Sequence, residues 1–240
     1  MDNQRIFAGE KSFDIGCRVL KWDEPGGLDL TPYKKYSTKK GSFEDLSKQV
    51  RQFTVHWSVT YTAKSTFTGI QARGLSANFI MGDDDINGYS SIYQCLDLFN
   101  FGWSQGDRFN TIGHGVEISY MPDLFKQVRY TPEIISKYKV QPHESMSAPV
   151  HGTKLKVYLP TKAQMNSLVQ LIWGVTELFP NINPEFPKNN GSYITTNINS
   201  PENYSGLLSH YHLTRDKIDT AGLDYSWIEK ELDLRKKLGY

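Results

Sequence analysis

The sequence predicts an α/β layered domain in which one β-sheet is covered by helices. Short runs rich in β-branched and aromatic residues alternate along the chain with segments of helical periodicity, and this alternation is typical of such layers. The chain has 240 residues, of which 38% are hydrophobic and 22% are charged, so it can bury one substantial core. We therefore expect a single domain over residues 1–240, with a core from about residue 13 to 238 and residues 1–12 as an N-terminal extension.

Five segments have the composition of short strands, because β-branched and aromatic side chains favour a half-buried pleated surface. They cover residues 53–60, 76–81, 91–98, 114–120 and 155–159.

The clearest helix signal follows Pro160. Thr161 and Gln164 fit a capping box, in which each side chain bonds the backbone N–H of the other residue. Apolar residues then recur at intervals of three and four positions as far as Pro180: Met165, Leu168, Leu171, Ile172, Val175 and Leu178. This pattern predicts a helix that lies with one face on the sheet. Two further helices are expected over residues 62–72 and 227–238, and two long irregular segments over 21–42 and 181–203.

Charge and hydropathy limit the partners of the protein. The 27 basic and 26 acidic residues leave a formal net charge of +1, so no overall field attracts the chain to nucleic acid or to an anionic membrane. A local basic cluster is interpreted as a solvated loop: Lys34, Lys35, Lys39 and Lys40. No segment approaches the roughly 20 apolar residues of a membrane span. The sequence leaves the oligomeric state open.

The cysteines and the N-terminus bear on the compartment. Cys17 and Cys95 lack metal-type spacing and are expected to be free buried thiols, with one disulfide as the alternative. The first residues lack the apolar core of a secretory signal peptide, so we expect no export by that route.

Three separated segments carry side chains that suit a metal. His56 lies in an apolar β-type run, His210 follows Ser209, and Asp219 lies shortly after. Two imidazoles and one carboxylate form a zinc set with one position left open, as in hydrolytic zinc sites. A rival set replaces Asp219 with His212, because residues two apart on a strand face the same side; Asp219 would then support an imidazole. A lone strand histidine is more often a hydrogen-bonded interior residue.

The same segments resemble the zinc-dependent N-acetylmuramoyl-L-alanine amidases, the family that includes phage lysins and autolysins and shares its fold with peptidoglycan recognition proteins. The similar segments occur in the family's order: Val55-His56-Trp57, residues 75–80, residues 92–97, Asn110 with Gly115-Val116-Glu117, residues 206–210 and Lys217-Ile218-Asp219. The resemblance implies a single central, mainly mixed β-sheet flanked by helices. It also implies Zn2+ as cofactor, with His56, His210 and Asp219 as ligands.

By the same resemblance, Glu117 is the general base and Lys217 faces the substrate. Zinc lowers the pKa of its bound water towards about 7, a carboxylate can move the proton, and a lysine can stabilise the developing oxyanion. The alternatives are a strand-end glutamate paired with a lysine, and an ordinary surface lysine. His114 stands where the family commonly has an apolar residue; it is interpreted as a satisfied, partly buried residue, with a cleft residue as the alternative. His143 and His151 fit no template and are interpreted as surface residues.

The resemblance implies hydrolysis of the amide between N-acetylmuramic acid and the L-alanine of the stem peptide, in a peptidoglycan or muropeptide substrate. We expect a cell-wall lytic role, as a phage endolysin released through a membrane hole or as a virion-associated lysin. The alternatives are a recognition module that binds peptidoglycan without cutting it, and a cytoplasmic muropeptide-recycling amidase. After the aromatic Trp103, where the family usually has a histidine, this chain has Ser104, which bears on substrate contacts.

Overall fold

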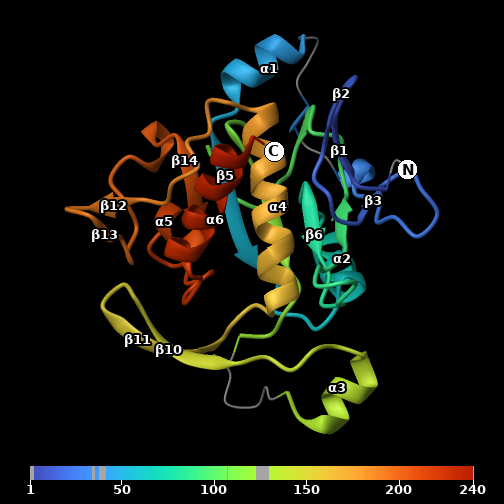
Figure 1. The fold of residues 1–240 in the computed structure, drawn as a ribbon, viewed down its shortest axis with the longest axis vertical. Coiled ribbons are helices and arrows are strands. Elements are labelled where there is room, and N and C mark those ends of the chain that lie inside the picture. Colours follow the sequence, from blue (N-terminus) through green and yellow to red (C-terminus); the bar gives the residue numbers. More distant parts are fainter. Residues whose placement is uncertain (1–2, 34–35, 38–41, 107, 123–129, 240) are drawn as a thin grey trace.

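The computed structural model describes residues 3–33, 36–37, 42–106, 108–122 and 130–239, and it is built around one six-stranded sheet (Figure 1). In spatial order the strands are β14 (Gly206–Ser209), β5 (Gln52–Trp57), β9 (Gly113–Ile118), β6 (Phe79–Met81), β7 (Ile92–Gln94) and β3 (Val19–Lys21). Neighbouring strands are parallel except for β6 and β7, which are antiparallel. This arrangement confirms the predicted mixed sheet.

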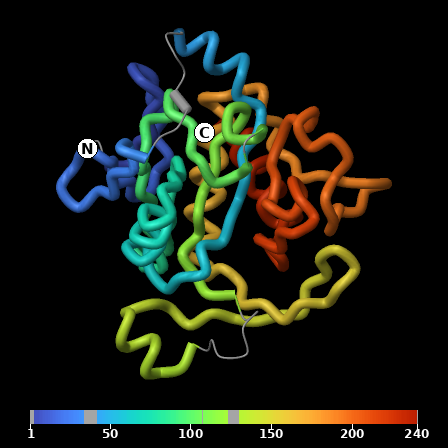
Figure 2. Tube along the Cα trace, turned by 180° about the vertical axis from the view of Figure 1, so that it is seen from behind, coloured from blue at the N-terminus to red at the C-terminus, as the bar shows by residue number. Residues whose placement is uncertain are grey.

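Helices cover both faces of the sheet, as Figures 1 and 2 show from opposite sides. Side chains of a strand alternate between the faces, and in β6 the core splits accordingly. Phe79 and Met81 join the large apolar cluster under α4 (Lys162–Leu178), whereas Ile80 joins a smaller cluster with Ile70 of α2 (Ala63–Ala72). The layered α/β prediction is therefore confirmed.

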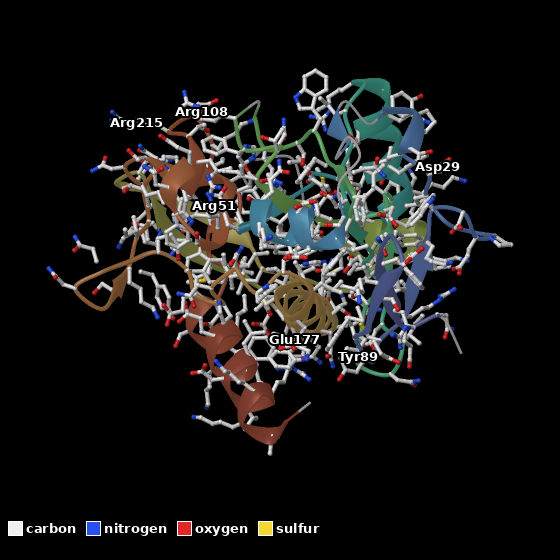
Figure 3. The ribbon with its side chains drawn as sticks, turned by 90° about the horizontal axis from the view of Figure 1, so that it is seen from above. Asp29, Arg51, Tyr89, Arg108, Glu177 and Arg215 are labelled. Carbon is white, nitrogen blue, oxygen red and sulfur yellow. The ribbon has the colours of Figure 1, made fainter. Side chains whose placement is uncertain are left out.

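The helix α4 begins at the predicted capping box. The Thr161 hydroxyl accepts from the Gln164 N–H at 3.2 Å, and the Gln164 side chain accepts from the Thr161 N–H at 3.0 Å. The Gln164 amide also donates to the carbonyls of Gly82 and Ser119, both at 2.9 Å, which fixes the start of α4 to the sheet. Figure 3 looks nearly along this helix, with Tyr89 beside it; Gln170 donates to the Tyr89 hydroxyl at 3.5 Å.

The other predicted helices also form. α2 is capped by Thr62, and α6 (Tyr225–Leu238) is capped by Asp224 and begins two residues before the predicted start. The sequence analysis missed α1 (Phe43–Gln49), α3 (Pro132–Tyr138) and α5 (His210–Leu213), each of seven residues or fewer. Helices this short have little periodicity to detect, since isolated short helices are marginal and depend on packing.

The N-terminal residues pack against the domain. β1 (Arg5–Ala8) and β2 (Lys11–Asp14) form an antiparallel hairpin, and Ile6 and Ala8 are fully buried in the main core. Gly174 of α4 lacks the Cβ that would collide with Ile15, so the chain after the hairpin approaches the helix closely.

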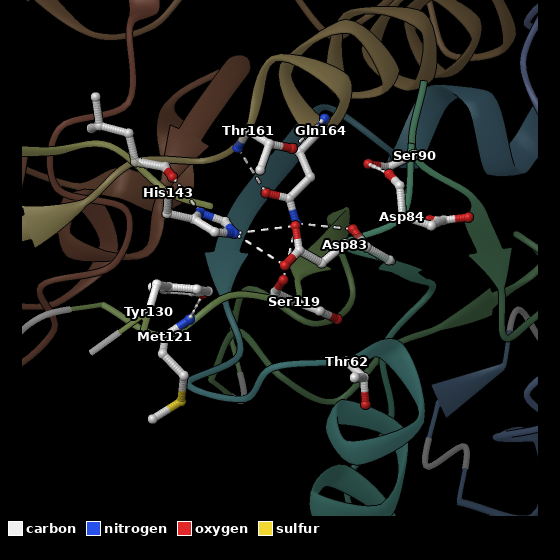
Figure 4. Close-up of polar contacts among 12 residues, drawn as sticks. Thr62, Asp83, Asp84, Ser90, Ser119, Met121, Tyr130, His143, Thr161 and Gln164 are labelled. Carbon is white, nitrogen blue, oxygen red and sulfur yellow. Dashed lines mark hydrogen bonds and ion pairs between the residues drawn. The ribbon is translucent and has the colours of Figure 1, made fainter. Parts of the chain in front are cut away.

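A lobe built from α3, β10 (Ser145–Val150) and β11 (Thr153–Tyr158) lies below the sheet in Figure 1. Its base is fixed by His143, whose ring contacts the Leu159 carbonyl at 2.6 Å through Nδ1 and both Asp83 oxygens at 3.1 Å through Nε2 (Figure 4). The side chains of His143 and Asp83 are almost fully buried. The interpretation of His143 as a surface residue is therefore wrong, because tertiary contacts bury this polar segment.

The predicted loops contain only short elements. Residues 21–42 include a 3-10 turn (Thr31–Tyr33) and β4 (Tyr36–Ser37), which pairs with β8 (Asn100–Phe101); Lys34, Lys35, Lys39 and Lys40 lie outside the described residues. Residues 181–203 include the hairpin of β12 (Lys188–Asn189) and β13 (Ser192–Tyr193) and a 3-10 turn (Pro201–Asn203). Arg51, labelled in Figure 3, donates to the Glu202 carbonyl at 2.8 Å and ties that turn to the start of β5.

The prediction for the two cysteines is confirmed. Cys17 and Cys95 are free and buried, as expected. Within the described part of the chain, no helix has the length and apolar character needed to cross a bilayer.

His114 differs from both of its interpretations. It pairs in register with Phe53 of β5, lies on the α4 side of the sheet and is 0% exposed. Its ring stacks on Phe101 (5.3 Å between centroids) and contacts Phe179 (5.1 Å). Neither ring nitrogen has a hydrogen-bond partner among the described residues, so this histidine is neither a cleft residue nor satisfied.

Candidate metal centre

The candidate ligands meet at the carboxyl ends of adjacent parallel strands. His56 lies near the end of β5, opposite Glu117 of β9. Ser209 at the end of β14 is opposite Val55, so His210, which follows it, lies beside His56. Carboxyl ends of parallel strands share one edge of a sheet, which is where open α/β sheets place their ligands. Asp219 comes from the loop after α5, and its backbone carbonyl accepts from the Tyr211 N–H at 2.9 Å.

Three ligand atoms point at one another. Nδ1 of His56 and Nδ1 of His210 are 3.0 Å apart, and Oδ2 of Asp219 lies 3.2 Å from the first and 3.1 Å from the second. All three residues are buried. A tetrahedral zinc ion with bonds of about 2.0–2.1 Å holds its ligand atoms about 3.3 Å apart. The observed triangle is close to that requirement, so the donor set fits a zinc ion.

The protonation states also suit a metal. Burial, followed by the nearby His210, lowers the pKa of His56 to about 4, although Asp219 opposes this shift. Burial alone would raise the pKa of Asp219, but His210 and His56 outweigh it and hold this pKa well below its usual range. His56 is therefore neutral and Asp219 ionised at neutral pH, which are the forms that bind metal. Nε2 of His56 has no hydrogen-bond partner among the described residues.

Glu117 and Lys217 line the same pocket as the three ligands, a cavity of about 230 Å³. The structure thus brings all five predicted site residues together; the roles assigned to them stay predictions. Burial, followed by the negative charge of Asp219, raises the pKa of Glu117 to about 8, whereas Arg73 and Lys217 lower it. Positive charge at the ligand triangle would act in the same direction as these two cations. It would move Glu117 towards the ionised form that a general base requires.

His212 is not placed with the ligands. It lies in the helix α5, where side chains two positions apart point in different directions. The rival ligand set of His56, His210 and His212 assumed a strand at this point, and that assumption is wrong. Its Nδ1 accepts from the Ser209 N–H at 3.0 Å, and its Nε2 donates to the Ile194 carbonyl at 2.8 Å. Both nitrogens are occupied within the protein, and His212 fastens α5 to the preceding segment.

Arg73 and Val59 are among the pocket-lining residues that the sequence analysis missed. Arg73 follows the last residue of α2, and Val59 follows β5 with a φ of 55° and 38% of its surface exposed. A β-branched residue in the left-handed region is strained. No motif marks either position, because an arginine after a helix and a valine after a strand are common in any sequence.

His151 was interpreted as a surface residue, and it lies at the tip of the β10–β11 hairpin with part of its surface exposed. It is half-buried, and its Nε2 donates to the carbonyl of Lys217 at 2.9 Å. The contact joins the tip of the β10–β11 hairpin to the segment that carries Lys217 and Asp219.

Comparison with known proteins identifies the fold of this chain, but it assigns the chain to no protein family. No protein-family model matches the sequence, and no curated protein matches it significantly. Several solved structures have a similar fold. Hydrolase AmiA of Staphylococcus aureus, in complex with its ligand, has a TM-score of 0.50 and 12% identity, over 92% of this chain and 85% of that chain. AMPDH3 of Pseudomonas aeruginosa, in complex with anhydromuramic pentapeptide, has a TM-score of 0.49 and 14% identity, over 85% and 65%.

A third is the Ph2119 endolysin of Thermus scotoductus MAT2119 bacteriophage Ph2119, with a TM-score of 0.45 and 12% identity, over 89% of this chain and 98% of that chain. This chain spans about 65% of the length of AMPDH3. At sequence identities this low, the similarity is evidence for the fold alone. The chain therefore has the amidase-like fold that its sequence resemblance predicts, with a buried His-His-Asp cluster at the carboxyl ends of its parallel strands.

Proposed function

We propose that this chain is a zinc-dependent N-acetylmuramoyl-L-alanine amidase. The observation that carries the proposal is the triangle of His56 Nδ1, His210 Nδ1 and Asp219 Oδ2, with separations of 3.0–3.2 Å, beside Glu117 and Lys217 in one pocket. The amidase-like fold and the ordered sequence motifs support it. The substrate bond is taken from the sequence resemblance: the amide between N-acetylmuramic acid and L-alanine of the stem peptide.

The three ligands would hold the ion through two neutral imidazoles and one carboxylate. A bound zinc ion acidifies water and polarises a carbonyl group. The pocket side chains supply the remaining chemistry. Glu117, opposite His56 on the neighbouring strand, takes the proton of the attacking water and delivers it to the leaving amine nitrogen.

Lys217 lies on the pocket wall as a second functional group. Its ammonium group places positive charge beside the scissile carbonyl oxygen, on which negative charge develops as water attacks. This interaction is stronger in the transition state than in the ground state, and it therefore raises the rate rather than only the affinity.

Digestion of purified peptidoglycan tests the proposal. The zinc-loaded protein should release stem peptides that begin with L-alanine, as read by mass spectrometry. Chelation should abolish the release and zinc should restore it. Asp219→Ala, which removes a ligand, should be inactive with or without zinc. Binding to the wall without released peptide, under conditions where zinc is bound, would contradict the amidase and identify a recognition module.

The lytic role expected from the sequence needs a separate comparison. A lytic enzyme should cleave intact sacculi at least as readily as soluble muropeptides of the same composition. Preference for the soluble fragments would instead assign the protein to muropeptide recycling.

A further inference from the structure

The turn of the β10–β11 hairpin has an unusual residue at its tip. Val150 pairs with Thr153, and the two residues between them, His151 and Gly152, have φ values of 50° and 79°. Positive φ at both positions defines the type I′ turn, which strongly favours Asn-Gly. The β12–β13 hairpin of the same chain has that sequence, since Asn190 and Gly191 have φ values of 49° and 79°. The chain thus has histidine where its own matching turn has asparagine.

The histidine ring makes contacts that asparagine could not make. Nε2–H of His151 donates to the Lys217 carbonyl at 2.9 Å, and the ring lies edge-on to Tyr211 with centroids 6.1 Å apart. The Tyr211 N–H in turn donates to the Asp219 carbonyl at 2.9 Å. His151 therefore bonds the Lys217 end of the 217–219 segment directly and contacts Tyr211, which bonds the Asp219 end. This segment carries the carboxylate ligand and the pocket lysine.

The β10–β11 hairpin is itself fixed to the rest of the protein, so its contacts through His151 can restrict the position of the 217–219 segment. Its inner side chains Ala148, Val150 and Val157 are buried in the main core. Its base is joined to the sheet through the buried His143–Asp83 pair (Figure 4). Its tip is joined to Thr195, whose carbonyl accepts from the His151 N–H at 2.9 Å. An arm fixed at both ends can hold the loop that it contacts.

We propose that His151 is a positioning residue: its hydrogen bond to the Lys217 carbonyl sets the position of the Asp219 carboxylate and the Lys217 side chain in the metal pocket. This inference rests on the proposed function, because it assigns a role in the same site. Partners that hydrogen-bond a metal ligand directly typically change metal affinity by about 10- to 100-fold when they are removed. His151 acts through the backbone two residues before Asp219, so we expect an effect at the lower end of this range.

Two substitutions separate positioning from turn stability. His151→Asn suits a type I′ turn better than histidine, but its amide is too short to reach Lys217. His151→Gln keeps an N–H donor with a reach similar to that of Nε2. Asn190→His places a histidine at the same position of the matching turn, for which the described residues show no hydrogen bond to the 217–219 segment, and serves as the control.

Each purified variant is titrated with Co2+, which gives both an affinity and the visible absorption of the bound ion, and is unfolded in urea with chelator present. We expect His151→Asn to keep or raise the stability of the metal-free protein, while its Co2+ affinity falls about tenfold or more and its absorption spectrum changes. His151→Gln should recover most of the affinity. Asn190→His should bind Co2+ as the wild type does, with slightly lower stability.

The result that overturns the inference is a His151→Asn protein that binds Co2+ with wild-type affinity and spectrum. The inference is also overturned if His151→Asn loses Co2+ affinity only in proportion to a loss of stability in urea, and His151→Gln does not recover that affinity. In both cases the wild type still binds metal and cleaves its substrate, so the proposed function stands. A wild type that binds no metal overturns the proposed function and this inference with it.

Discussion

Replacing His114 with leucine should stabilise the protein, although the residue lies in the central strand β9. Its ring is fully buried, and neither nitrogen has a partner among the described residues. Each unsatisfied buried polar group costs about 1–3 kcal/mol, whereas losing the ring contacts with Phe101 and Phe179 costs about 0.5–1.5 kcal/mol. Leucine has a similar volume and no polar atom, so we expect a net gain of roughly 1–3 kcal/mol in the free energy of unfolding at pH 7.

The gain should grow in acid. Burial lowers the pKa of His114 from 6.5 to about 3. Below pH 6.5 the unfolded chain binds a proton at this residue and the folded protein does not, so the wild type loses stability as the pH falls from 6.5 towards 3. The loss is about 1.4 kcal/mol per pH unit. The leucine variant lacks this loss, and the difference between the two proteins should therefore be about 2 kcal/mol larger at pH 5 than at pH 7.

Urea unfolding followed by tryptophan fluorescence measures both quantities, with chelator present so that metal binding does not contribute. His212→Leu is the matched control: both nitrogens of His212 are hydrogen-bonded, so the same substitution there should destabilise the protein. The reasoning is refuted if His114→Leu is less stable than the wild type at pH 7, or if the difference does not change between pH 7 and pH 5.

Three further predictions concern the metal pocket. Glu117→Gln should bind zinc as the wild type does but lose about 10²- to 10⁴-fold in turnover, because the amide cannot transfer the proton. Metal analysis and peptide release measure the two quantities. Metal loss in this variant would count against Glu117 as the base. Zinc at about 100 times its dissociation constant should raise the free energy of unfolding by about 2.7 kcal/mol in urea titrations. Asp219→Ala should show no such rise, and an equal rise there would exclude Asp219 as a ligand. Lys217→Met should lower kcat by about 10²- to 10³-fold with little change in metal content; a change in KM alone would assign Lys217 to binding.

Much of the fold could be predicted because its signals are local. The capping box of Thr161 and Gln164, and the apolar periodicity that follows, determine α4 without help from the rest of the chain. The runs around His56 and Glu117 have strand composition, and their order along the chain matches the family pattern. What the sequence could not supply were the short helices and the N-terminal hairpin, whose stability comes from packing rather than from propensity.

The sequence by itself identified side chains whose donor atoms suit zinc, through their residue types and through the resemblance of their order to the amidase pattern. Only the tertiary structure decided the state of each histidine. His210 and His212 are two positions apart, yet α5 directs one towards His56 and engages both nitrogens of the other within the protein. His143 and His151 have polar neighbours in sequence, but partners 60 and 66 residues away bury or bond them. Burial and charge depend on the atoms that surround a group, and folding brings those atoms from distant parts of the chain.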